Sequence, residues 1–257
     1  MASSLLRNIQ RAGRRTICCK AAAALALAIF ANTPALAGEA EIRKALAERL
    51  ADLGKIDEVI KLPVAGLYEV RVGDRIFYTD DDGNYLIIGQ LLDTKTGTNL
   101  TEARVAKLTA IDFASLPLKD AVVWKQGDGS RKLVVFADPN CGFCKQFERE
   151  ARSVKNITIY TFLYPVLGAE SADKSRNIWC AKDRGKVWAD WMIDGALPPK
   201  AMGECDTSAL QRTAALGRKH KINGTPALVF EDGKRVPGAM KLDDLEKQLL
   251  ASAKKPG

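Results

Sequence analysis

Several protein classes are excluded by what this sequence lacks. It has no internal repeat, no low-complexity segment and a single histidine, His220. Apolar residues make up 47% of the chain and charged residues 27%, which are ordinary proportions for a globular protein and exclude a disordered or fibrous one. The apolar run 21–31 is too short to cross a bilayer, since a membrane-spanning helix needs about 20 residues.

The first 37 residues contain no aspartate or glutamate. Five basic residues precede the apolar run 21–31, and the tripeptide Ala35-Leu36-Ala37 ends the segment with small residues. This order is typical of a secretory signal peptide, so we expect residues 1–37 to be removed on export. The alternative is an N-terminal amphipathic or membrane-anchoring helix.

Much of the positive charge of the chain lies in this segment. The formal net charge is +8, and the loss of five basic residues with segment 1–37 leaves +3. We therefore expect no nucleic-acid partner. Cys18 and Cys19 lie in the same segment, so the mature chain keeps four cysteines: Cys141, Cys144, Cys180 and Cys205. An even number is typical of exported chains, in which disulfides persist.

Residues 38–97 are predicted to form a small α+β domain. The apolar spacing over Glu39 to Leu53 predicts an amphipathic helix, and Gly54 follows it. Short strands with turn residues between them are predicted at 59–62, 67–72, 75–78 and 85–88. A core of roughly 60 residues is marginal on its own, so a partner subunit is expected to help stabilise it.

Residues 98–116 are predicted to form a linker helix. Thr98 or Asn99 is available as its N-cap, and the apolar pattern continues through Val105 and Leu108 to Ile111. The alternative is that this segment packs into one continuous fold.

The remaining residues, 117–257, alternate between strand and helix patterns. Strands are predicted at 122–124, 133–137, 157–163 and 227–230, and helices at 142–153, 170–194, 207–220 and 242–253. Asp232-Gly233 predicts a hairpin turn. This order predicts an α/β domain with a sheet covered by helices.

The pair Cys141 and Cys144 lies where the strand 133–137 gives way to a helix. Unpaired N–H groups at a helix N-terminus stabilise a thiolate, which is the nucleophile of disulfide exchange. Cys144 is one turn further along, within reach of Cys141. Two other interpretations remain: a structural disulfide, and a zinc site completed by Cys180 and Cys205, whose spacing of 25 is wide for a second ligand pair.

Gly224-Thr225-Pro226 directly precedes the predicted strand 227–230. A proline there can be cis, which leaves the backbone of Thr225 free to pair with an extended substrate, although trans proline is far more common. His220 has no cysteine near it in sequence and is predicted to be a solvated residue near a helix end, not a general base. Trp179, Trp188 and Trp191 have helical spacing and are predicted to be core residues.

Together these motifs resemble the thioredoxin superfamily and, more narrowly, the periplasmic disulfide isomerases of the DsbC/DsbG type. The resemblance rests on the segment from Phe136 to Cys144 and on Gly224-Thr225-Pro226. The segment 178–183 is similar to the one that carries the additional cysteine of those proteins, and 78–83 is similar to part of their N-terminal domain. The similarity extends over residues 39–253.

The resemblance implies a thioredoxin-like catalytic domain joined by a linker helix to a small N-terminal dimerisation domain. Cys141 would be the attacking thiol, Cys144 the resolving thiol, and Thr225 and Pro226 the substrate-binding loop. Cys180 and Cys205 would form a structural disulfide; the alternative is a second redox centre. A loop of this length contributes about 3 kcal/mol in the chain-entropy model, which favours the structural role.

The resemblance also implies a function. The protein would be a periplasmic homodimer that isomerises wrong disulfides in exported proteins, with no cofactor or metal, and a membrane thiol reductase would keep Cys141 and Cys144 reduced. Two alternatives remain. One is a dithiol oxidase, which starts from the disulfide form, and the other is a dimeric holdase chaperone whose thiols are incidental.

Overall fold

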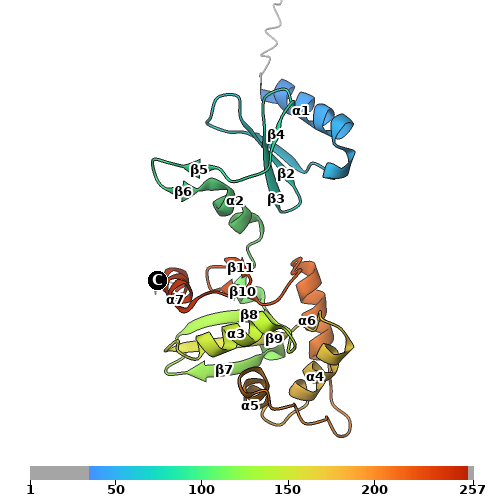
Figure 1. Ribbon diagram of the computed structural model, residues 1–257, viewed down its shortest axis with the longest axis vertical. Helices are drawn as coiled ribbons and strands as arrows, with labels where there is room; N and C mark the ends of the chain where they lie inside the picture. Colours follow the sequence, from blue (N-terminus) through green and yellow to red (C-terminus); the bar gives the residue numbers. More distant parts are fainter. Residues whose placement is uncertain (1–34, 254–257) are drawn as a thin grey trace, which may run out of the picture.

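The computed structural model describes residues 35–253, with side chains from residue 38 onward. Nearly all of the predicted signal peptide, 1–37, therefore lies outside the described residues. These fold into two lobes that are joined by one crossing of the chain (Figure 1). Within the described residues, no helix combines the length and apolar character needed to span a bilayer.

The N-terminal lobe is an antiparallel sheet covered by one helix. The helix α1 (Ala35–Arg49) is followed by a single 3-10 turn at Ala51–Leu53. The sheet has the order β1-β2-β3-β4, with bounds Glu58–Lys61, Tyr68–Val72, Arg75–Thr79 and Leu86–Ile87. Two-residue strands β5 (Leu92–Asp93) and β6 (Thr98–Asn99) form a separate ribbon. The four predicted strands are therefore present.

The core of this lobe is small. It consists of six buried side chains from α1 and the first three strands: Ile42, Leu46, Val59, Tyr68, Val70 and Phe77. Arg104, on the connecting helix, spans the sheet surface and forms ion pairs with Glu58 and with the buried Glu69. Much of the lobe is therefore near its surface, as expected for a unit of this size.

The helix that leaves this lobe is shorter than predicted. The helix α2 covers Leu100–Leu108, with Asn99 as its N-cap accepting from the backbone N–H of Glu102. It ends at Thr109, and the N–H of Ile111 donates instead to the carbonyl of Gly233 in the other lobe at 2.9 Å. The prediction of one helix through Ile111 was therefore wrong: Ile111 is a core residue of the second lobe, not part of an apolar helix face.

The C-terminal lobe is a five-stranded sheet between two apolar layers. Its strand order is β11-β10-β8-β9-β7, with bounds Arg235–Pro237, Ala227–Phe230, Arg131–Ala137, Ile157–Leu163 and Val122–Gln126. The central pair β8 and β9 is parallel, and the other pairs are antiparallel. Helices α3 (Gly142–Ala151), α4 (Ala169–Trp179), α5 (Arg184–Ala189), α6 (Ser208–Lys219) and α7 (Leu242–Ser252) surround the sheet.

Successive side chains of β8 point alternately into the two apolar layers of this lobe. Leu133 and Val135 face the larger cluster, which includes side chains of α3, α5 and α7, whereas Val134 and Phe136 face the second cluster. The predicted helix 170–194 is divided at Asp183, whose side chain caps α5 by accepting from the N–H of Lys186 at 2.9 Å. The α/β prediction for this lobe is confirmed.

Candidate functional site

Cys141 lies at the point where the buried strand β8 ends and α3 begins. It is the N-cap residue of α3, and its sulfur accepts the N–H of Cys144 at 3.4 Å. The sulfur therefore occupies the position at which an anion is stabilised by the free N–H groups of a helix. Only 6% of Cys141 is exposed, and Cys144 is buried at 1%.

The loop before β10 brings a second segment against Cys141. The Sγ of Cys141 lies 3.2 Å from the carbonyl oxygen of Thr225, to which it donates, although 84 residues separate them in sequence. The peptide bond between Thr225 and Pro226 is cis. The carbonyl of Pro226 accepts the N–H of Gly238 at 2.8 Å, which ties this loop to the end of β11. The fold therefore brings Cys141, Cys144, Thr225 and Pro226 into one site.

The two cysteines of the site are free thiols with different environments. Burial raises the pKa of the Cys144 thiol far above its usual value, and its hydrogen bond with the Cys141 sulfur raises it further. Cys144 is therefore a protonated thiol at neutral pH as long as Cys141 is also reduced. Of the two sulfurs, that of Cys141 lies at the N-terminus of α3.

Asp138 holds the loop between β8 and Cys141. Its carboxylate is fully buried and accepts four hydrogen bonds of 2.7 to 2.9 Å, from the backbone N–H groups of Asn140, Val166 and Leu167 and from the hydroxyl of Ser171. Its carbonyl accepts the N–H of Cys141 at 3.1 Å. One side chain thus joins the cysteine loop to the turn after β9 and to α4.

Trp191 supports the same loop from the other side. Its indole N–H donates to the carbonyl of Pro139 at 2.6 Å. The ammonium groups of Lys145 and Lys174 lie 3.9 and 4.2 Å from its ring centroid, so the ring is in contact with two cations. Burial and the proximity of Lys174 lower the pKa of Lys145.

Exposed apolar side chains surround this buried pair. Phe143, between the two cysteines, is 67% exposed, and Val166 and Leu167 are also exposed. Since Asp138 binds the backbone of both Val166 and Leu167, these side chains are held beside the cysteine loop. An apolar rim of this kind suits contact with an unfolded polypeptide.

Cys180 and Cys205 lie apart from this site. They form a disulfide with Cα atoms 5.9 Å apart, which joins the end of α4 to the segment before α6. Trp179 strengthens the same junction, since its indole N–H donates to the carbonyl of Asp206 at 2.9 Å. Neither sulfur is available to complete a zinc site with Cys141 and Cys144, so that interpretation is not supported.

The described residues offer one other cluster with metal-ligating groups, Asp80, Asp81 and Asp82. Asp80 already accepts the N–H groups of Asn84 and Tyr85 at 2.7 and 3.0 Å, which explains its place in the turn before β4. Exposed acidic groups of this kind are common in turns.

The predictions for the histidine and the tryptophans have different outcomes. Trp179, Trp188 and Trp191 are buried, as predicted. His220 lies at the C-cap of α6, as expected for a helix end, but it is partly buried, and this burial lowers its pKa. It lies on a cavity at the junction of the lobes, away from the cysteines.

Asp138 and Lys174 were missed by the sequence analysis. Asp138 stands three residues before Cys141, but a single sequence does not distinguish a buried aspartate from the usual turn residue. Lys174 lies within the predicted helix 170–194, and the structure buries it against Trp191. Neither position has a signal in local sequence, because both depend on contacts with distant elements.

Each lobe matches a domain of known protein families. Residues 33–102 match the N-terminal domain of disulfide bond isomerase proteins, and residues 118–253 match a thioredoxin-like domain. The crystal structure of a disulfide interchange protein from Neisseria gonorrhoeae is 34% identical, with a TM-score of 0.51; the match covers 55% of this chain and all of that one.

Two curated relatives carry the similarity along most of the chain. The probable thiol:disulfide interchange protein DsbC of Bordetella parapertussis is 47% identical over 184 residues, which is 72% of this chain and 65% of that protein. The chain thus matches somewhat less than two thirds of that relative's length. Thiol:disulfide interchange protein DsbC of Salmonella typhimurium is 32% identical over 222 residues, 83% of this chain and 87% of that protein. With its reactive-loop geometry and both domain types in the same order, the chain belongs to the DsbC family of thiol:disulfide interchange proteins.

Proposed function

We propose that this protein isomerises wrong disulfides in exported proteins, with Cys141 as the attacking thiol. The observation that carries the proposal is the position of the Cys141 sulfur, between the N–H of Cys144 at the start of α3 and the carbonyl of Thr225. The helix N-terminus stabilises a thiolate there, and the Thr225 backbone lies where an extended substrate can pair with it.

The proposed rearrangement leaves the number of substrate disulfides unchanged, so it needs no external electron donor. The Cys141 thiolate attacks one sulfur of a substrate disulfide, that S–S bond breaks, and a mixed disulfide forms between Cys141 and the substrate. The released substrate thiolate is free to be protonated by solvent or to attack elsewhere. A second substrate thiolate then attacks the mixed disulfide, which forms a new substrate disulfide and restores the Cys141 thiolate.

Cys144 can release the substrate from the mixed disulfide. When its thiolate attacks Cys141, the Cys141–Cys144 disulfide forms and the substrate leaves with both of its sulfurs reduced. Two electrons must then return from a thiol reductant, for which we propose a membrane-embedded reductase. Burial raises the pKa of Cys144, so its attack is slow, and the mixed disulfide has time to rearrange. Slow exit favours isomerisation over net reduction of the substrate, and the raised pKa makes Cys144 a poor leaving group in the Cys141–Cys144 disulfide from which a dithiol oxidase would start.

The N-terminal lobe supports the proposal of a homodimer. Its segment 85–92, from the residue before β4 to the start of β5, has large exposed apolar side chains: Tyr85 is 74% exposed, Ile88 79% and Leu92 55%. The strand β4 is also an edge of the sheet, with one neighbour only. An edge strand with exposed apolar side chains is a ready interface for a second copy. We place this dimer in the periplasm, in accord with the predicted signal peptide.

Two matched variants test the mechanism. Cys141→Ala should abolish the recovery of a small secreted protein from its scrambled disulfides, by at least about a thousandfold in rate, because no other thiol occupies the helix N-terminus. Cys144→Ala should retain part of this activity and accumulate the mixed disulfide, which is visible on a nonreducing gel.

The same variants separate the alternatives. A holdase with incidental thiols would suppress aggregation and give no thiol-dependent recovery in the unsubstituted protein. If Cys141→Ala still rearranges disulfides, the exchange mechanism is wrong.

A further inference from the structure

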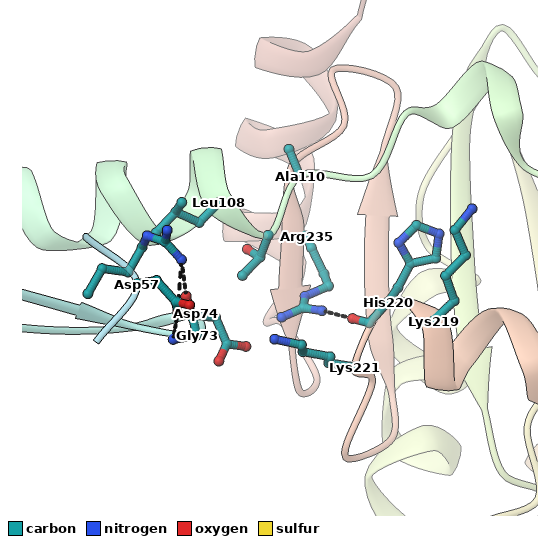
Figure 2. A pocket seen from close by; sticks show the side chains of 11 residues that line it. Asp57, Gly73, Asp74, Leu108, Ala110, Lys219, His220, Lys221 and Arg235 are labelled. Atoms are coloured by element: carbon teal, nitrogen blue, oxygen red, sulfur yellow. Dashed lines mark hydrogen bonds and ion pairs between the residues drawn. The ribbon is translucent and has the colours of Figure 1, made fainter. Parts of the chain in front are cut away.

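Two adjoining cavities lie beside the loop of Thr225 and at the junction of the lobes. The first, of about 330 Å³, is lined in part by residues 221–227, which include Thr225, the residue in contact with Cys141. The second, of about 360 Å³, lies between the lobes and is lined by the turns of the N-terminal sheet, the end of α2, the end of α6 and β11 (Figure 2). Asp74, Lys221 and Arg235 line both cavities, so the two are neighbours.

Unpaired cations gather at the shared wall. Among the described residues, Lys219, Lys221 and Arg235 have no ion-pair partner. Arg235 donates to the carbonyl of His220, which fixes its guanidinium beside Lys221 (Figure 2). A fixed guanidinium next to a free ammonium is a suitable pair of donors for a carboxylate.

The carboxylates of the cavity do not neutralise this pair. Asp57 is engaged by the N–H of Gly73 at 2.6 Å and by Arg71 at 3.3 Å. Asp74 faces Lys221 across the cavity without forming an ion pair within the described residues. The cavity thus holds four permanent cations, Arg71 among them, against two carboxylates.

Neighbouring cations contribute to the pKa of two titrating groups that line this cavity. The pKa of His220 is lowered by burial and by the charges of Lys219 and Arg235. The pKa of Asp57 is lowered chiefly by the hydrogen bond from Gly73, with contributions from Arg71, Lys55 and Lys221. An anion that enters this cavity therefore meets a favourable field from several elements.

We propose that Lys221 and Arg235 form a subsite for an acidic side chain of the substrate polypeptide, close in sequence to the cysteine that reacts with Cys141. The subsite rests on the proposed function and extends it to substrate choice. Thr225 and Lys221 are four positions apart in the chain, a reach of at most about 14 Å, which an extended substrate spans in about four residues. A glutamate or aspartate about four positions from the substrate cysteine is therefore the group that the subsite selects.

Substitutions of Asp74 and of Lys221 should change the preference for acidic substrates in opposite directions. Because Asp74 faces Lys221 from the other lobe, it competes with the substrate carboxylate. Removal of its charge should strengthen the preference for acidic substrates, whereas removal of the Lys221 charge should weaken it. If these residues serve only to hold the lobes together, both substitutions loosen the same contact and have the same sign.

The experiment uses the mature protein, residues 38–257, with Cys141 and Cys144 reduced, and short peptides with one cysteine; Cys18 and Cys19 are absent from this protein. The cysteine carries an uncharged 2-thiopyridyl group, so attack of Cys141 on the peptide sulfur breaks that disulfide and releases pyridine-2-thione, which is followed by its absorbance. Peptide pairs differ only in Glu or Gln, four positions before or after the cysteine. The second-order rate is measured at low and at high ionic strength, for the unsubstituted protein, Lys221→Gln and Asp74→Asn.

We expect the Glu peptide of one pair to react about fivefold faster than its Gln partner at low ionic strength, and the advantage to disappear at about 0.5 M salt. Lys221→Gln should reduce the advantage to below about twofold, and Asp74→Asn should raise it to about tenfold. Neither substitution should change the rate with Gln peptides.

Four results would overturn the proposal or its foundation. Equal rates for Glu and Gln peptides in both pairs contradict the subsite. Changes of the same sign in the two variants indicate a contact between the lobes instead. The same rates are also measured with added inorganic phosphate at constant ionic strength, and equal slowing of the Glu and Gln peptides indicates a site for a free anion. Absence of reaction with every peptide contradicts the exchange function itself and is thus distinct from failure of the subsite.

Discussion

The two cysteine pairs of this protein lie in one domain, but one pair is free and the other forms a disulfide. Cys141 and Cys144 are three residues apart, buried and free, at the start of α3. Cys180 and Cys205 are 25 residues apart, partly buried and joined. The first pair has a helix N-terminus and the Thr225 backbone around it, and the second joins the end of α4 to the segment before α6. Position in the fold, not residue type, determines which pair is suited to exchange electrons.

The helix α4 connects the two pairs. Near its start, Ser171 binds the Asp138 carboxylate, which also holds the loop of Cys141. Its end is capped at Cys180. The disulfide therefore fixes one end of a helix whose other end supports the reactive loop, so the structural pair contributes to the rigidity of the exchanging pair.

The largest expected effect separates the pairs by stability. Cys180→Ala with Cys205→Ala should lower the free energy of unfolding by about 3 kcal/mol, because a long loop is no longer closed. Urea unfolding measures this loss in a Cys141→Ala/Cys144→Ala background, which prevents thiol shuffling. The same double substitution with Cys141 and Cys144 intact should leave the exchange rate within about twofold. A loss of exchange activity comparable with that of Cys141→Ala would show that the pairs act together.

The second effect is a pH dependence that belongs to the exchanging pair alone. Burial raises the pKa of Cys144 in the folded protein, so the unfolded chain loses its proton first as the pH rises. Below the pKa of about 8.5 in the unfolded chain, the full contribution of Cys144 to the free energy of unfolding is present. Above it the contribution falls, by about 2 kcal/mol between pH 8.5 and 10.

Unfolding of Cys141→Ala over this pH range, compared with Cys141→Ala/Cys144→Ala, measures the contribution. The first protein should lose stability more steeply than the second. Parallel curves would mean that Cys144 titrates in the folded protein as it does in the unfolded chain.

The smallest effect tests the link through α4. Ser171→Ala should cost about 1 kcal/mol, because Asp138 loses one of its four donors and keeps three. Ser175→Ala is the matched control, since the buried hydroxyl of Ser175 has no hydrogen-bond partner and its removal should cost nothing. Equal losses in both variants would contradict the proposed support of the reactive loop by Ser171.

The sequence predicted the elements of the site better than its supports. Local patterns were enough to place Cys141 at a strand-to-helix transition and Thr225-Pro226 before a strand. The end of α2 was not predictable, because Ile111 leaves the helix to bond Gly233, a contact between segments far apart in sequence. For the same reason the four donors to Asp138 had no local signal. Periodicity reports which face of an element is buried but not which distant group meets it.

The most direct test of the proposed function is the redox state of the cysteines in the cells that produce the protein. Acid quenching followed by alkylation with a mass-tagged maleimide counts the free thiols. The account predicts that two thiols, Cys141 and Cys144, are labelled without reduction, and that Cys180 and Cys205 are labelled only after it. A Cys141–Cys144 pair that is fully oxidised in these cells would contradict the proposed isomerase and would indicate a dithiol oxidase.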